Sequence, residues 1–534
     1  MSRKAIKNAK IIDGSSSSWF WGSLLIEKGE ITEIISGRRA EKLSSRYNFT
    51  STDEVIDAQG DFLAPGFIDI HTHSDLTLLA QGKAASKVQQ GVTTEVIGNC
   101  GSSPAPYGET DKETIKTELA DYGLELTWRT FPEFLSILAQ KKTSVNIVPL
   151  LGLGAVRSAV GGYSNQELSG EELKEAKEII ADAMEAGARG VSSGLIYPPS
   201  SYSNTAELIS LAKVASAYGG LYATHLRNEG CDLVAALKEA LTIGEQAEIP
   251  VQISHHKVSE KSCWGLVAGT IKMMENARQR GIDVTCDLYP YLASNTGLAS
   301  LIPDWAHEGG KEKLLKRLKE PTARDKVLTS LAETGENRGW DKIMVSHLAG
   351  GAHQKFAGSY ISEIAQSWKV SGAEAVIKIL QDNELRAGMI SFAMCEEDLI
   401  EVLTSRLSMI GSDGSSLARE GILAKGQPHP RNFGTFARVL GKYVRDKKIL
   451  PLEEAIHKMT GKPAARLGLA QRGIIKPGNK ADLVLFSAEE INDKATFKEP
   501  FQYPEGIKRV MVAGENVVKD KEHQRVYPGE LIRA

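Results

Sequence analysis

The sequence predicts an α/β protein whose main unit is a (β/α)8 TIM-like barrel. Three observations lead to this prediction. Short apolar runs alternate with helical patterns through the middle of the chain, strand-like runs occupy both ends, and one long charged stretch interrupts the alternation. Strands that alternate with helices are typical of a parallel sheet, and eight of them favour a closed barrel. The other predicted parts are a small β-sandwich domain built from both chain ends and a helical insertion after the seventh strand.

Both ends of the chain have the composition of short strands. The β-favouring runs are residues 5–12, 23–35, 481–486 and 508–518. Lys28, Gly29 and Glu30 interrupt the second run in the manner of a hairpin turn. Because neither end is long enough to bury a core alone, we expect residues 1–64 and 468–534 to form one composite β-domain.

The barrel is assigned to residues 65–467 because eight apolar runs recur there. The predicted strands are residues 67–73, 93–98, 145–151, 190–195, 221–225, 251–255, 283–289 and 409–413. Helical sequences separate most of them. Between the third and fourth strands, Ser169 and Glu172 form a capping-box pattern ahead of apolar residues at helical spacing. Gly187 then lies where a helix end favours a residue that tolerates a positive φ.

The connection between the seventh and eighth strands is unusually long. It contains more than a hundred residues, including the strongly charged helical pattern of residues 308–324. A single crossover does not need that length. We therefore expect an inserted, mainly helical subdomain at about residues 295–390. The Gly- and Pro-rich segment 414–433 is predicted to be an active-site loop.

The charge balance and the cysteine content restrict the class of protein. Lys and Arg number 64 against 67 Asp and Glu, which gives no electrostatic support for a nucleic acid or an anionic membrane as partner. No run approaches the ~20 apolar residues of a membrane span, and the basic N-terminus lacks the apolar core of a signal peptide. The five cysteines argue against a disulfide framework and favour a reducing cytoplasm.

Several polar residues lie where the predicted strands end. His71 and His73 close the first strand, and residues two apart in a strand face the same way, so both imidazoles can reach one metal ion. His225, His255 and Asp413 close the fifth, sixth and eighth strands. Catalytic groups of barrel enzymes lie at the C-terminal ends of different strands. Packing alone does not explain why polar residues recur at the ends of these apolar strands.

Cys100 follows the second strand between glycines that let the backbone approach a pocket. Sulfur together with imidazole favours zinc over magnesium or calcium. A cysteine nucleophile paired with histidine is the alternative role. The four other cysteines are expected to be buried, inert thiols: Cys231, Cys263, Cys286 and Cys395. Strand alternation turns His256 away from the metal and Lys257 towards the side of His255.

The order of these residues resembles the amidohydrolase superfamily, and the details resemble its N-acyl-D-amino-acid deacylase (D-aminoacylase) family. The matching segments span nearly the whole chain and are residues 65–73, 98–101, 193–197, 224–229, 254–257, 289–291, 412–414 and 429–431. One departure is Ser74, which stands where relatives commonly carry an acidic residue. Many superfamily members bridge two metals with a carboxylated lysine on the fourth strand, and residues 188–194 contain none.

The resemblance implies a zinc-dependent hydrolase of N-acyl-D-amino acids. It assigns a tight zinc ion to Cys100, His225 and His255, and a weaker second position near His71 and His73. Asp413 would take the proton of the attacking water and pass it to the leaving nitrogen. The substrate carboxylate would be held by Arg431 with Lys257, Tyr197, Tyr289 and, as a weaker candidate, Ser294.

Two other functions are weighed against this hydrolase. A cyclic-amide hydrolase acting on hydantoin- or dihydropyrimidine-like rings is disfavoured by the missing strand-four lysine and by the presence of Cys100. A non-catalytic assembly protein, as in relatives that have lost metal ligands, is disfavoured because every expected ligand is present. The sequence leaves the preferred D-amino acid, the acyl group and the oligomeric state open.

Overall fold

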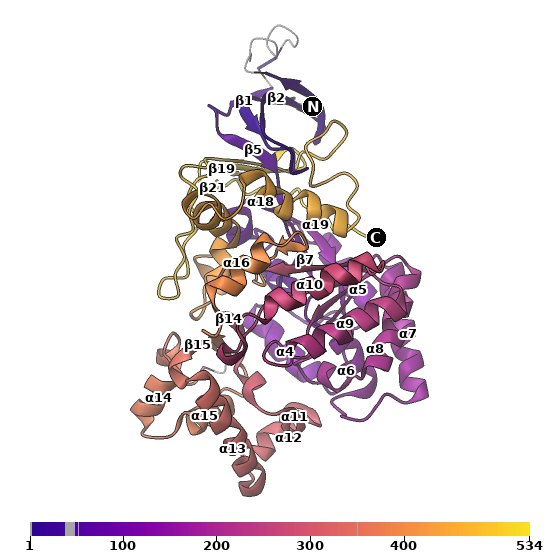
Figure 1. Cartoon of the computed structure of the whole chain (residues 1–534), viewed down its shortest axis with the longest axis vertical. Helices are drawn as coiled ribbons and strands as arrows, with labels where there is room; N and C mark the ends of the chain where they lie inside the picture. Colours follow the sequence, from indigo (N-terminus) through magenta and orange to yellow (C-terminus); the bar gives the residue numbers. More distant parts are fainter. Residues whose placement is uncertain (1–2, 38–48, 52, 350) are drawn as a thin grey trace.

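The computed structural model of the chain describes residues 3–37, 49–51, 53–349 and 351–534. Figure 1 places the first strands at one end of the long axis and α13, α14 and α15 at the other, with the parallel strands and their helices between them. Within the described residues, no helix combines the length and apolar character needed to cross a membrane.

Both ends of the chain contribute to one nine-stranded sheet. Its strands are β1 (Lys4–Ile11), β2 (Phe20–Glu27), β3 (Glu30–Ser36), β4 (Glu54–Asp57), β5 (Phe62–Pro65), β18 (Leu483–Phe486), β19 (Ile507–Val512), β20 (Glu515–Lys519) and β21 (Glu522–His523). The ends meet where β5 pairs antiparallel with β18, with Leu63 opposite Leu485. Apolar side chains from both ends, among them Ile6 and Met511, share one buried cluster.

The middle of the chain forms parallel strands in two sheets. They are β6 (Phe67–Asp69), β7 (Val92–Ile97), β8 (Asn146–Pro149), β9 (Leu151–Gly152), β10 (Gly190–Gly194), β11 (Leu221–His225), β12 (Val251–Ile253), β13 (Val284–Leu288) and β17 (Ser408–Ile410). One sheet has the order β6-β7-β8, and the other has the order β17-β13-β12-β11-β10-β9. Only Leu150 separates β8 from β9, and a parallel bridge joins Thr72 to Gly414. A strand therefore occurs in each of the eight predicted runs, and the predicted α/β class is confirmed.

Helices alternate with these strands. They are α2 (Asp75–Ala80), α3 (Ala85–Val88), α4 (Lys112–Asp121), α5 (Phe131–Gln140), α6 (Leu153–Gly161), α7 (Gly170–Glu185), α8 (Thr205–Ala217), α9 (Leu233–Ala247), α10 (Leu266–Gln279), α16 (Glu396–Thr404), α17 (Arg431–Arg438), α18 (Leu452–Met459) and α19 (Gly461–Arg466). The predicted capping box begins α7, where the Ser169 side chain accepts from the Glu172 amide. The same helix buries Ala176, Ile180 and Ala183, as their helical spacing predicts.

The segment between β13 and β17 contains strands as well as helices. Its elements are β14 (Ser294–Gly297), α11 (Asp304–His307), α12 (Gly310–Arg317), α13 (Pro321–Arg338), β15 (Ile343–Leu348), α14 (Ile361–Trp368), α15 (Gly372–Asp382) and β16 (Ala387–Ser391). The three strands form an antiparallel sheet that the sequence did not predict, because short apolar runs between helices do not reveal distant pairing. A separate buried cluster, with Leu331 and Ile377 among its members, packs this segment.

Candidate metal centre and active site

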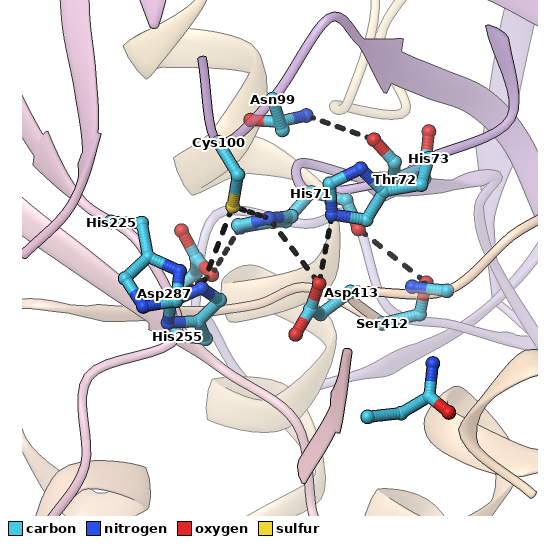
Figure 2. Close-up of polar contacts among 12 residues, drawn as sticks. His71, Thr72, His73, Asn99, Cys100, His225, His255, Asp287, Ser412 and Asp413 are labelled. Carbon is cyan, nitrogen blue, oxygen red and sulfur yellow. Dashed lines mark hydrogen bonds and ion pairs between the residues drawn. The ribbon is translucent and has the colours of Figure 1, made fainter. Parts of the chain in front are cut away.

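Polar side chains from five parallel strands converge at one end of the sheets. His71 and His73 follow β6, Cys100 follows β7, and His225 ends β11. Two further residues, His255 and Asp413, follow β12 and β17. Figure 2 shows these side chains pointing toward one another although they come from distant parts of the chain.

Cys100 lies at the centre of this arrangement. Its Sγ atom is 3.3 Å from Nε2 of His71 and 3.5 Å from Nε2 of His255. Burial raises the pKa of the thiol, but the imidazoles of His71 and His255 outweigh burial and hold that pKa well below its ordinary value. The sulfur is therefore favoured as a thiolate, which is the form that binds metal ions.

Both ring nitrogens of His225 are buried, and neither makes a hydrogen bond to any residue that the structure describes. The Nε2 atom lies 3.5 Å from a carboxylate oxygen of Glu229. Burial lowers its pKa, yet the Glu229 carboxylate and the Cys100 thiolate raise it to about 9. The ring centroid lies 4.3 Å from that of His255. Buried polar atoms in native structures are almost always satisfied, so these nitrogens point to a missing ligand.

The donor atoms form two groups that share His255. In one group, ligand atoms of His71, Cys100, His255 and Asp413 all lie within 4.8 Å of one another. In the other, His225, Glu229 and His255 satisfy the same distance. His73 lies beside the first group, with Nε2 3.0 Å from Oδ1 of Asp413.

Asp413 connects the imidazoles to Arg431. Its Oδ1 atom is 3.0 Å from His73 and 3.6 Å from Nε2 of His71, and its Oδ2 atom is 2.8 Å from Nη1 of Arg431. Burial raises the pKa of this carboxyl, but Arg431 and then His255 hold it well below its usual range. Asp413 is therefore ionised at neutral pH and can accept a proton.

Three of these residues adopt backbone conformations that side chains rarely tolerate. The φ angles are 52° at Cys100, 35° at His255 and 49° at Asp413. A non-glycine residue with positive φ is costly, and such residues cluster at functional sites where the surroundings hold them in place. At Cys100, His255 and Asp413, this strained backbone conformation follows the end of a strand, and the side chain points into the shared site.

The predicted substrate-binding residues form one wall of the site. The Arg431 guanidinium lies 4.7 Å from the centroid of the Tyr289 ring, and Nη2 donates to the Asn295 carbonyl oxygen at 3.2 Å. Tyr197 and Thr296 share a hydrogen bond of 2.8 Å between their hydroxyl groups. Ser294 lies on β14 beside Asn295, so β14 brings the inserted segment against the site. The Tyr289 hydroxyl is buried and has no hydrogen-bond partner among the described residues.

Comparison with known proteins agrees with this geometry. The model of the Amidohydrolase family matches residues 54–518. The chain belongs to this family. A D-aminoacylase and an N-acyl-D-aspartate deacylase, both of Alcaligenes xylosoxydans xylosoxydans, are 35% and 33% identical to it, over 89% and 99% of the chain and 88% and 94% of their own lengths.

A solved structure resembles this amidohydrolase over its whole length. The crystal structure of N-acyl-D-glutamate deacylase from Bordetella bronchiseptica, complexed with zinc and a phosphonate inhibitor that mimics the tetrahedral intermediate, gives a TM-score of 0.82. The identity is 30%, and the match covers 99% of both chains. The similarity to the D-aminoacylase family noted in the sequence is therefore confirmed.

Two carboxylates of this amidohydrolase orient its imidazoles, and neither was predicted to have a role. Asp287 accepts from the His255 amide at 2.8 Å, and its Oδ1 lies 3.1 Å from Nδ1 of His71. Glu229 lies 2.9 Å from Nδ1 of His255 and 3.5 Å from Nε2 of His225. Asp287 stands inside a predicted strand, and the spacing within that strand does not show which group it meets.

Glu229 also pairs with Lys257, which the sequence analysis predicts to bind the substrate. The Lys257 Nζ atom is 2.6 Å from Oε1 of Glu229 and 2.9 Å from Nδ1 of His255. Burial raises the pKa of Glu229, but Lys257 and then His225 hold it well below its ordinary value. Lys257 is on the His255 side, while the His256 ring turns away and contacts the Thr270 hydroxyl at 2.8 Å. These orientations agree with the prediction, but β12 ends at Ile253 and His255 has a φ of 35°, so strand alternation does not produce them.

A buried charged network lies beneath the site. The Lys87 Nζ donates to Oδ2 of Asp69 at 2.7 Å and to the Ser412 hydroxyl at 2.6 Å, and it lies 3.9 Å from Oε2 of Glu95. Glu95 in turn accepts a hydrogen bond from Ser74. Ser74, which departs from the usual acidic residue, therefore supports a carboxylate from the neighbouring strand.

The cysteines differ from their predicted state at two positions. Cys231 and Cys263 form a disulfide, with Cα atoms 5.3 Å apart, and Cys231 is exposed. The prediction that both are buried, inert thiols was wrong, because parallel pairing of β11 with β12 brings together two loops that are distant in sequence. Cys286 and Cys395 are buried and free, as predicted. The cysteine content thus gives no support for a reducing compartment.

Proposed function

We propose that this amidohydrolase uses zinc to hydrolyse the amide bond of N-acyl-D-amino acids, giving a D-amino acid and a carboxylate. One observation carries the proposal: a buried thiolate, several imidazoles and an ionised aspartate converge at the ends of the parallel strands. Relatives named D-aminoacylase and N-acyl-D-aspartate deacylase cover most of the chain and support the substrate class.

The residues present fit a zinc site. Cys100, His225 and His255 would hold the tight ion, and His71 and His73 would hold a weaker second ion. The buried ring nitrogens of His225, which make no hydrogen bond within the described residues, support this assignment, and thiolate with imidazole is a ligand set that zinc prefers. When bound, zinc polarises a carbonyl and lowers the pKa of water from 15.7 to ≈ 7.

Asp413 is the proposed general base and acid. Its carboxylate is held beside His71 and His73 in its ionised form, so it can take the proton of the attacking water. The same proton is then available for the leaving nitrogen, which departs as a neutral amine. A carboxylate held by Arg431 keeps its orientation throughout this transfer.

The carboxylate of the substrate amino acid is proposed to be held by Arg431, Lys257, Tyr197 and Tyr289. Ser294 is a weaker candidate for the same role. Arg431 carries a planar guanidinium group, and its Nε atom has no hydrogen-bond partner within the described ranges, while Nη1 pairs with Asp413 and Nη2 donates to Asn295. Lys257 supplies a second positive charge. Tyr197 and Tyr289 supply hydroxyl donors, because burial raises their pKa values well above the ordinary value and keeps both phenols neutral.

The arrangement of the site disfavours the two alternative functions, a cyclic-amide hydrolase and a non-catalytic assembly protein. A cyclic-amide hydrolase with a carboxylated lysine is disfavoured because β10 reads Gly190-Val191-Ser192-Ser193-Gly194. A non-catalytic assembly protein is disfavoured because the expected ligands lie together. The partner is then a small N-acyl amino acid, and a cytoplasmic location stays a prediction from the sequence.

We also propose the finer architecture that the sequence predicts. The bridge between Thr72 and Gly414 and the short step from β8 to β9 support one closed (β/α)8 barrel over residues 65–467. The shared nine-stranded sheet supports a composite β-sandwich domain of residues 1–64 and 468–534. The separate apolar cluster supports an inserted subdomain at about residues 295–390.

A substrate panel tests the proposed activity. Zinc-replete protein is incubated with acetyl-D-amino acids, acetyl-L-amino acids and hydantoins, and mass spectrometry measures the free amino acid from the acetyl compounds and the N-carbamoyl amino acid from the hydantoins. We expect release from acetyl-D-amino acids only. Activity confined to hydantoins would favour the cyclic-amide alternative, and inactivity on every compound would contradict hydrolysis altogether.

A further inference from the structure

A covalent cross-link joins two loops beside the proposed metal site. The first loop, residues 226–232, follows β11, and the second, residues 254–265, follows β12. The disulfide between Cys231 and Cys263 connects them. Cys231 is exposed, so a small thiol in solution can reach this bond.

The first loop carries the carboxylate that orients two proposed zinc ligands. Glu229 lies two residues before Cys231, 2.9 Å from Nδ1 of His255 and 3.5 Å from Nε2 of His225. Carboxylates that bind the outer nitrogen of a metal-binding histidine fix its orientation and typically change metal affinity 10- to 100-fold when removed. The position of this loop therefore bears directly on zinc binding.

The second loop holds Glu229 from the other side. Lys257 donates to the Glu229 carboxylate at 2.6 Å, and the Ser259 amide donates to the Glu229 carbonyl oxygen at 2.8 Å. At the start of the first loop, Arg227 donates to the Ser201 and Ser203 carbonyl oxygens at 2.8 Å each. Nearer the disulfide, the Asn228 carboxamide accepts from the Gly230 amide at 2.8 Å. Between the two loops, the disulfide is thus the covalent part of an attachment that otherwise consists of hydrogen bonds and the pairing of Glu229 with Lys257 and His255.

We propose that the Cys231–Cys263 disulfide is a redox-sensitive clamp that positions Glu229 against His225 and His255 and thereby sets how tightly the protein retains zinc. This inference rests on the proposed metal site. It adds a covalent modification at two cysteines that are not among the proposed zinc ligands.

The reductant of the clamp is a low-molecular-weight thiol. Its thiolate attacks Sγ of Cys231, forming a mixed disulfide and releasing Cys263 as a thiolate. A second thiolate attacks the small-molecule sulfur of that mixed disulfide and releases Cys231. The protein disulfide gains two electrons, two small thiols become one disulfide, and the protons they lose are available to the two cysteines. The small-molecule disulfide reverses both steps.

The first test establishes the bond in the intact protein. Protein treated with oxidised glutathione is alkylated before and after reduction, and cysteine peptides are identified by mass spectrometry. We expect Cys231 and Cys263 to resist alkylation until they are reduced. Two thiols that are free under these oxidising conditions would overturn the proposal.

The second test measures zinc rather than turnover. Oxidised protein and protein reduced by a thiol, freed of reagent under nitrogen, compete with a chelator for zinc. We expect the zinc dissociation constant to rise about 10-fold on reduction. The control is C231S/C263S, which retains Cys100. Its zinc dissociation constant should equal that of the reduced wild-type protein and should not change on treatment with the thiol. A change below twofold in the wild-type protein would overturn the clamp.

Glu229→Gln keeps the inference testable if the double variant does not fold. We expect this variant to bind zinc more weakly and to lose the redox effect, because the clamp acts through the Glu229 carboxylate. An undiminished redox effect in Glu229→Gln would contradict that route. A second zinc equivalent gained on reduction would instead mean that Cys231, Glu260 and Cys263 bind metal, and would also overturn the clamp.

The outcome is separable from the proposed activity. Redox-dependent zinc retention in a protein inactive on every acyl amino acid supports the clamp and contradicts the substrate assignment. Deacylase activity with redox-independent zinc retention overturns the clamp alone. A protein that binds no zinc in either state contradicts both.

Discussion

At the scale of single residues, carboxylates decide which way the imidazoles face. Asp287 lies 3.1 Å from Nδ1 of His71, and this contact directs the Nε2 atom of the same ring at the Cys100 sulfur, 3.3 Å away. Glu229 contacts both His225 and His255. Imidazole rings held in this way keep one nitrogen ready for a metal ion, which lowers the cost of organising the site when the ion binds.

Replacing Cys100 tests the thiolate. We expect Cys100→Ala to raise the zinc dissociation constant at least about 100-fold, because it removes the only sulfur among the proposed ligands. Zinc retained after dialysis against a chelator gives the measurement. Cys286→Ala is the matched control, since burial raises the pKa of that thiol to about 12 and keeps it protonated. Equal zinc retention in both variants would contradict the assignment.

Replacing Asp413 tests the proton transfer. We expect Asp413→Asn to lower kcat at least about 100-fold while the tight zinc ion stays bound, because the amide cannot accept the proton of the attacking water. Steady-state kinetics on an acetyl-D-amino acid and a zinc assay on the same sample separate the two effects. A variant that keeps near-normal kcat would show that another group moves the proton.

At the scale of secondary-structure elements, the network around Lys87 joins α3, β6, β7 and the loop after β17. Lys87 neutralises Asp69 and lies near Glu95, and Asp69 accepts from the Ser412 amide at 2.8 Å, next to Asp413. All three charged side chains are fully buried. A buried charge left without its partner is strongly destabilising, so these elements depend on one another.

Lys87→Met measures that dependence. We expect it to reduce the free energy of unfolding by about 3–5 kcal/mol, because two buried carboxylates lose their cation. Urea denaturation followed by circular dichroism gives the value. Lys174→Met on the exposed face of α7 is the control and should change it by no more than about 1 kcal/mol. Similar losses in both variants would mean that the network contributes little.

The contrast between strand ends and loops explains what the sequence could predict. His225 ends its strand, and His71, His255 and Asp413 closely follow theirs. Because the ends of parallel strands lie at the same edge of a sheet, the positions of the strands in the sequence were sufficient to predict that these side chains lie close together. The pairing of Cys231 with Cys263 depends on the paths of two loops, which hydrophobic periodicity does not encode. The antiparallel sheet of β14, β15 and β16 was missed for a related reason, because its strands are short and separated by helices.

At the scale of the whole molecule, the inserted segment closes over one side of the site. The Tyr202 hydroxyl donates to the Asp304 carbonyl oxygen at 2.8 Å, and Arg386 pairs with Asp121 at 2.7 Å, so contacts on both sides fasten it to the parallel-strand unit. A small cavity of about 20 Å³ lies beside Tyr289, and Leu288, Met394 and Leu399 are among the residues that line it. It has room for about one water molecule.

The nine-stranded sheet has a consequence for biosynthesis. Because β5 pairs with β18, residues near position 63 must wait for residues near position 485 to leave the ribosome before that part of the sheet can form. Until then the β5 edge is unpaired, and unpaired edges invite association with other chains. The nascent protein therefore carries an unpaired strand edge from the synthesis of β5 until that of β18, and chaperone binding to its N-terminal strands should persist over that interval.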